Sequence, residues 1–282
     1  MDYRRPLAPL GSPGSIASAV SIDRARALRD ERRAVLDLCR TLSDAQWDTP
    51  SDCAGWTVKD VISHMGAAFH GCFTPWLLKV MRSDSVERSN DDDVATRRAW
   101  EPSRVLREYE SWGGRLMALV PLTQRPPVRA IPIPLGDVGR YPVGLLASAF
   151  VFDHHVHLRH DIASALGVSL PRPDATHMAA VLEWLLAGLP QMCASALAWL
   201  DRPVALILTG DGGGAWTISP PGPGSRIRVD PGRSPVAVAA ITAPVDDFPI
   251  WGTTRRPWRD YGLALEGDGE LATRFLDSLN LV

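Results

Sequence analysis

Apolar residues recur at helical spacing over most of the first 200 residues, the periodicity of amphipathic helices packed on a common core. This spacing predicts five helices. They cover residues 21–42, 57–72, 105–119, 143–166 and 173–200. Thr57 and Asp60 have the spacing of a capping box at the start of the second predicted helix, and Gly167 follows the fourth helix as a C-cap. Pro190 is expected to kink the fifth helix.

Two stretches interrupt the helical pattern. Residues 83–99 are polar and charged, which predicts a solvated, mobile loop. Residues 121–142 contain repeated prolines, which predict a long connection without regular structure. A connection of that length is typical of a lid or of a wall of a binding site.

The pattern changes after Arg202, where short β-prone runs replace the helices. The predicted strands are 204–209, 215–219, 226–229 and 236–242, and residues 246–253 and 269–279 are predicted to be helical. The glycines at 210–214 indicate a hairpin turn, because neither a Lys-Ser/Thr pair nor a helix follows them as in a phosphate loop. We therefore predict an α+β protein with a tail at 1–20, a metal-binding helical bundle at 21–201 and a small α+β domain at 202–282.

Composition narrows the class of protein. The formal net charge of the 282-residue chain is −2, which does not suggest a nucleic-acid partner. Cys39, Cys53, Cys72 and Cys193 are widely spaced, so we expect free thiols in a reducing cytoplasm. The chain contains no apolar run long enough for a membrane span, and early prolines and glycines break any signal-peptide core.

Residues 150–162 hold four of the seven histidines and no glycine or proline. At about 100° per residue, Asp153, His157 and His160 share one helix stripe, whereas His155 lies on the opposite side. Histidines on a helix are more often solvent-facing or satisfied core residues than metal ligands. A carboxylate and an imidazole one turn apart on an apolar face nevertheless favour a divalent cation, provided that a third ligand comes from elsewhere.

His64 supplies that third ligand, because it lies on the inward face of the second predicted helix. Two nitrogens and one oxygen suit Zn²⁺, with Ni²⁺, Fe²⁺ or Mn²⁺ as alternatives. Three protein ligands leave a position open for water or substrate, as in catalytic sites. Three roles are open to His160: a fourth ligand, a hydrogen-bond partner of a ligand, or an acid/base group. We favour a role other than metal ligation. Asp161 could hold the second nitrogen of a ligand histidine, but its helical angle favours a neighbouring helix or a salt bridge.

These motifs carry a resemblance. Gly55-Trp-Thr-Val-x-Asp-x-x-x-His64 and Asp153-x-x-x-His157 resemble the DinB-like superfamily and, within it, the mycothiol-dependent maleylpyruvate isomerase family of actinobacteria. Looser C-terminal patterns around Trp216 and residues 267–279 are similar to that family's C-terminal domain.

The resemblance implies a four-helix bundle with His64, Asp153 and His157 as metal ligands, and a low-molecular-weight thiol as cofactor. Two departures stand out: Asp153 replaces the family's glutamate, and one extra residue separates His157 from Asp161. The family's active-site arginine corresponds loosely to Arg255 or Arg256.

Two functions from different classes follow. The first is a metal-dependent, mycothiol-linked enzyme, an S-transferase or a cis–trans isomerase acting on a small electrophile, with His160 and Arg255 as catalytic residues. The second is a non-catalytic metal-binding or regulatory protein, because a fold of this kind does not by itself imply activity. For either, we expect a cytoplasmic monomer or homodimer with small-molecule partners and neither nucleic acid nor membrane.

Overall fold

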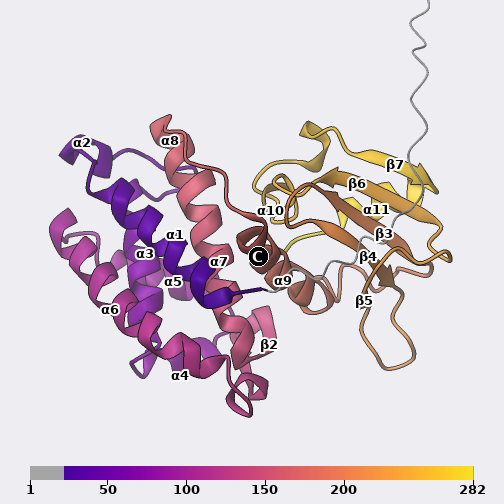
Figure 1. The fold of residues 1–282 in the computed structure, drawn as a ribbon, viewed down its shortest axis with the longest axis horizontal. Helices are drawn as coiled ribbons and strands as arrows, with labels where there is room; N and C mark the ends of the chain where they lie inside the picture. Colours follow the sequence, from indigo (N-terminus) through magenta and orange to yellow (C-terminus); the bar gives the residue numbers. More distant parts are fainter. Residues whose placement is uncertain (1–21, 282) are drawn as a thin grey trace, which may run out of the picture.

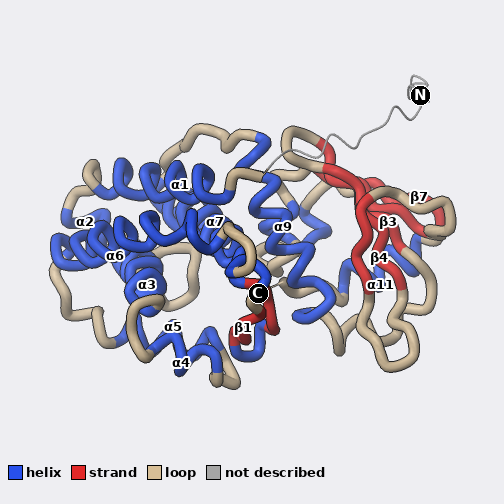
Figure 2. Tube along the Cα trace, turned by 60° about the horizontal axis from the view of Figure 1, so that its bottom comes forward, coloured by secondary structure: helices blue, strands red, loops and turns tan. Residues whose placement is uncertain are grey.

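A computed structural model, which describes residues 22–281, places a helical bundle at one end of the molecule and a five-stranded sheet at the other (Figure 1). α9 lies between them, and a separate two-stranded sheet, β1 with β2, lies beside the bundle, so the predicted α+β class is confirmed (Figure 2). The tail predicted at 1–20 falls outside the described residues.

The bundle pairs helices that are distant in the sequence: α3 packs on α6, and α1 packs on α6, α7 and α9. Its α-helices are α1 Arg24–Cys39, α2 Asp44–Trp47, α3 Val58–Gly71, α4 Trp76–Met81, α5 Val86–Ala95, α6 Pro102–Thr123, α7 Leu146–Val156, α8 Ser164–Leu166 and α9 Ala175–Met192. A π-helical segment, η4 His157–Ala163, joins α7 to α8. Short 3₁₀ turns are η1 Val128–Ala130, η2 Gly136–Val138 and η3 Val143–Leu145.

The start of α3 follows the predicted chemistry. The Thr57 hydroxyl accepts from the Asp60 backbone N–H, and the Asp60 carboxylate accepts from the Thr57 N–H, which completes the capping box. α3 buries mainly apolar side chains, and His64, only 5% exposed, is one of its buried polar residues. At the other end of the site, Gly167 ends α8 with a φ of 63°, which suits glycine.

Two predictions were wrong. The polar stretch 83–99 is not a loop but contains α5, which starts at the Ser85 cap and lays Val94 against the bundle. The proline-rich stretch 121–142 is also partly regular. Pro121 lies inside the last turn of α6, and β1 Pro132–Leu135 pairs antiparallel with β2 Gly139–Pro142. Prolines are tolerated in such a two-stranded edge, because not every backbone N–H has to join the ladder.

The sheet has five strands in the order β5-β4-β3-β6-β7. The strands are β3 Val204–Thr209, β4 Gly214–Ser219, β5 Arg228–Pro231, β6 Ala239–Pro244 and β7 Ala264–Gly267. β3 and β6 are parallel and the other pairs are antiparallel, with the predicted glycine turn joining β3 to β4. The pattern analysis missed β7, an exposed edge strand. The remaining helices are α10 Phe248–Trp251, η5 Trp258–Asp260 and α11 Gly269–Asp277.

Contacts of α9 and α10 connect the sheet to the bundle. α9 packs on α7 on one side and on β5 on the other, and α10 contacts both α7 and α9. This brings the segment after α10 close to η4. None of the described helices combines the length and apolarity needed to cross a membrane.

Candidate metal centre

Three predicted ligands converge where α3 faces the junction of α7 and η4. His64 Nε2 lies 3.3 Å from Asp153 Oδ1, and His157 Nε2 lies 3.5 Å from the same oxygen. Ligands bonded at about 2.0–2.1 Å in a tetrahedral zinc site stand roughly 3.3 Å apart, so this spacing fits a single cation. The ring centroids of the two histidines are 5.1 Å apart.

Charges at this cluster are strongly coupled. Burial would raise the pKa of Asp153, but the neighbouring His157, His154 and His64 hold it well below the usual range. Burial would lower the pKa of His157, but Asp153 and hydrogen bonds to Asp161 and Cys53 raise it well above the usual value. Without a cation, His157 therefore carries the proton that balances the carboxylates, and a bound cation would replace that proton.

Asp161 fixes the orientation of His157. The His157 Nδ1–H donates to Asp161 Oδ2 at 2.7 Å, and the Cys53 thiol donates to the same oxygen at 3.2 Å. Burial would raise the pKa of Asp161, but His157 and Arg255 lower it to about 2. Because Nδ1 is held in this way, Nε2 of His157 is the nitrogen directed at Asp153.

The π-helical segment explains why the sequence favoured a different position for Asp161. Our angles assumed about 100° per residue, whereas the wider π turn spans five residues per hydrogen bond and rotates less at each residue. Asp161 is thereby turned toward His157, and its salt bridge goes to Arg255.

A cavity of about 420 Å³ opens beside the cluster. His64, Asp153 and His157 form its polar floor, Trp56 and Phe152 form apolar walls, and Arg255 reaches it from the C-terminal segment. Further lining residues are Cys53, Ala54, Glu87, Asn90, Asp91 and Val156. Residues 121–142, which we expected to form a lid or a wall of the site, do not line this cavity. Residues of α5, which we expected to be a loop, do line it.

Arg255 donates to both carboxylate oxygens of Asp161, at 3.3 Å each, and remains partly exposed. Arg256 instead lies 3.6 Å from Asp52 and is largely exposed. Of the two arginines left open by the sequence, only Arg255 lines the cavity.

His160 lies away from the cluster. Its ring packs against His155, with 5.6 Å between centroids, and burial lowers its pKa to about 4. It does not line the cavity. The π turn again accounts for the difference, because it rotates His160 off the stripe of Asp153 and His157. The catalytic role that the sequence suggested for His160 stays a prediction.

The donor atoms suit a divalent cation. Asp153 Oδ2 is buried, and its neighbour His154 Nδ1, at 3.2 Å, does not make a well-aligned hydrogen bond to it, a costly state for a carboxylate oxygen. Cys53, His157 and Asp161 are also close enough to share an ion. We favour the set of His64, Asp153 and His157. In this set His157 binds through Nε2, whereas the set with Cys53 and Asp161 would use Nδ1, which already donates to Asp161.

The signals for Cys53 and Trp56 were weak in the sequence. Trp56 is tilted over His64, with 5.2 Å between ring centroids, and its Nε1 donates to Asp91 on α5. Both residues lie in the turn between α2 and α3, where the Trp56 N–H donates to the Cys53 carbonyl, so only the fold reveals that they border the cavity.

Inward side chains on facing helices are the way in which helical bundles build metal sites, so the fold and this cluster define a helical-bundle protein with a candidate metal centre. Residues 28–163 match the family model described as the mycothiol maleylpyruvate isomerase N-terminal domain. The bundle of this chain is therefore similar to that domain.

Solved structures extend the likeness beyond the bundle. A crystal structure of the mycothiol-dependent maleylpyruvate isomerase matches with a TM-score of 0.51, and a histidine-to-alanine mutant of it with 0.54. Each is 14% identical to this chain, and each match covers 86% of this chain and 91% of the other. Most of the chain, beyond the bundle alone, therefore shares their fold. No curated protein sequence matches.

Proposed function

We propose that this protein is a divalent-metal-dependent enzyme that uses mycothiol to act on a small electrophilic substrate, by isomerisation or by S-transfer. The observation that carries the proposal is the convergence of His64, Asp153 and His157 at the floor of a 420 Å³ cavity. The likeness to mycothiol-dependent maleylpyruvate isomerase supports the thiol and the reaction class.

In this proposal His64 Nε2, Asp153 Oδ1 and His157 Nε2 hold the cation, and Zn²⁺ is the cation that best suits two nitrogens and one oxygen. A divalent cation supplies a Lewis acid that lowers the pKa of a thiol or water beside it. Three protein ligands leave room for the thiol on the cavity side.

The remaining residues bind and orient. Asp161 holds the proton on Nδ1 of His157, which keeps Nε2 free of a proton for the cation. The Arg255 guanidinium is the cationic group of the cavity and can hold a carboxylate of the thiol cofactor or of the substrate. Trp56 and Phe152 exclude water on the apolar side.

A thiol bound in this cavity would supply a sulfur nucleophile for either reaction. Isomerisation would require the sulfur to add to an unsaturated carbon and to leave again, with the thiol returned. S-transfer would require a leaving group on that carbon that takes the electron pair.

The test is turnover of zinc-loaded protein with mycothiol and maleylpyruvate, followed by trials of other small electrophiles. We expect mycothiol-dependent turnover that is lost in His64→Ala and His157→Ala. Zinc binding at the cluster without thiol-dependent turnover of any electrophile would favour the non-catalytic metal-binding protein instead.

A further inference from the structure

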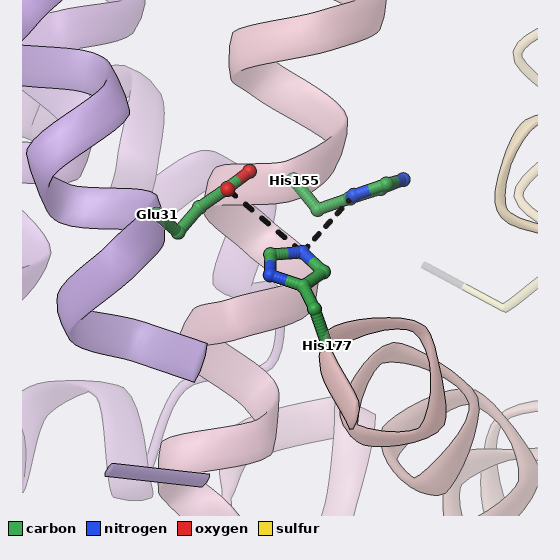
Figure 3. Close-up of side chains that lie close together, drawn as sticks. All are labelled: Glu31, His155 and His177. Carbon is green, nitrogen blue, oxygen red and sulfur yellow. Dashed lines mark hydrogen bonds and ion pairs between the residues drawn. The ribbon is translucent and has the colours of Figure 1, made fainter. Parts of the chain in front are cut away.

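A second group of ligand-type side chains lies on the other side of α7. Glu31 on α1, His155 on α7 and His177 on α9 point toward one another in the interior (Figure 3). All three are at most 5% exposed. His155 stands two residues from both Asp153 and His157, so it faces away from the cavity described above.

The spacing of the donor atoms matches one cation. His155 Nδ1 lies 3.2 Å from His177 Nε2, and Glu31 Oε2 lies 3.8 Å from that same nitrogen. The three donor atoms lie within 4.8 Å of one another. Tetrahedral ligands at bond lengths of about 2.0–2.1 Å stand roughly 3.3 Å apart, so small side-chain shifts would complete the set.

Hydrogen bonding alone does not satisfy this group. His155 and His177 can share one proton, but Glu31 Oε2 is then too far from His177 Nε2 to bond to it. Glu31 is held at its other oxygen, Oε1, by Arg159, which leaves Oε2 directed at the two imidazoles. A cation between the three atoms would engage all of them.

The surroundings permit a cation. Burial lowers the pKa of His177 to about 3, so this imidazole is neutral at neutral pH, the form that binds metal. A cavity of about 180 Å³ is lined by Glu31 and His177. Burial raises the pKa of Glu31 to about 7, so a cation would have to displace a proton from part of the population. The lining includes three arginines and three acidic residues. These are Arg26, Arg159, Arg172, Asp30, Glu31 and Asp174.

We propose that Glu31, His155 and His177 form a second divalent-cation site, which takes Zn²⁺ through two imidazole nitrogens and one carboxylate oxygen. The ion would tie α1, α7 and α9 together in the centre of the bundle. The site shares no ligand with the cluster around His64, so it does not depend on the proposed function.

Zinc stoichiometry of the full-length chain tests the proposal. Chelator-treated protein is reloaded with Zn²⁺ alone, and bound zinc is measured by native mass spectrometry and elemental analysis. We expect two ions in the wild type, one in His157→Ala, one in His177→Gln and none in the double variant. His157→Ala is the better disruption of the first site, because His157 belongs to both ligand sets around that cavity.

His70→Gln is the matched control. His70 binds Glu108 on α6, outside both clusters, so this variant should keep two ions. If His177→Gln does not fold, the zinc stoichiometry of His157→Ala tests the second site, because this variant leaves Glu31, His155 and His177 intact. His155→Gln in the His157→Ala background should then remove its remaining ion.

The outcomes separate the two sites. One ion in the wild type and none in His157→Ala would overturn the second site and leave the first. One ion in the wild type that survives His157→Ala and disappears in His177→Gln would support the second site and contradict the first. An ion that persists in the double variant would overturn this assignment of ligands.

Discussion

Substitution of Asp161 should change the zinc affinity of the metal centre without removing a ligand. Asp161→Asn keeps the shape of the side chain but removes the charge that holds Nδ1 of His157 at 2.7 Å. Loss of such a partner of a ligand histidine typically weakens metal binding about 10- to 100-fold, which corresponds to about 1.4–2.7 kcal/mol. The 2% exposure of Asp161 means that water cannot replace the lost contact.

The assay is a competition titration of Zn²⁺ between the protein and a chromophoric chelator at neutral pH. The His177→Gln background isolates the centre at His64. Asp52→Asn is the matched control: Asp52 carries a carboxylate near Arg256 and makes no contact with His157, so its zinc affinity should stay unchanged. Zinc affinity of Asp161→Asn within twofold of its parent would refute the claim that Asp161 orients the ligand.

Three further outcomes follow from particular contacts. Thr57→Ala breaks the capping box of α3 and should lower the free energy of unfolding by about 1 kcal/mol in chemical denaturation. Arg255→Met should raise KM for a carboxylate substrate about 10- to 100-fold with a smaller change in kcat, which steady-state kinetics would show; an unchanged KM removes Arg255 from binding. His177 stays neutral in the fold, with a pKa of about 3, but takes up a proton on unfolding below about pH 6.5. Metal-free wild type should therefore lose about 2 kcal/mol more stability than His177→Gln between about pH 8 and pH 5, and equal losses in urea titrations would contradict the buried neutral imidazole.

The sequence predicts those features of the fold that depend on residues close together in the chain. The capping box at Thr57, the spacing of Asp153 and His157, and the turn at Gly167 all appear as predicted. The inward position of His64 on α3 predicted that it would meet that pair. It lies 3.3 Å from Asp153, where α3 packs on η4.

Other features depend on geometry that no short pattern encodes. The π turn at His157–Ala163 rotates Asp161 and His160 away from their α-helical angles. α5 was predicted to be a loop because its charged residues outnumber its apolar residues, whereas the Ser85 cap and the packing of Val94 against the bundle stabilise it as a helix. The group of Glu31, His155 and His177 joins three helices that are far apart in sequence, so its members carry no common motif.

The most direct measurement of the central claim is an anomalous-difference map at the zinc absorption edge from crystals of the zinc-loaded protein. We predict a peak about 2.0–2.2 Å from His64 Nε2, Asp153 Oδ1 and His157 Nε2. A map with zinc bound elsewhere and no peak among these three atoms would contradict the account.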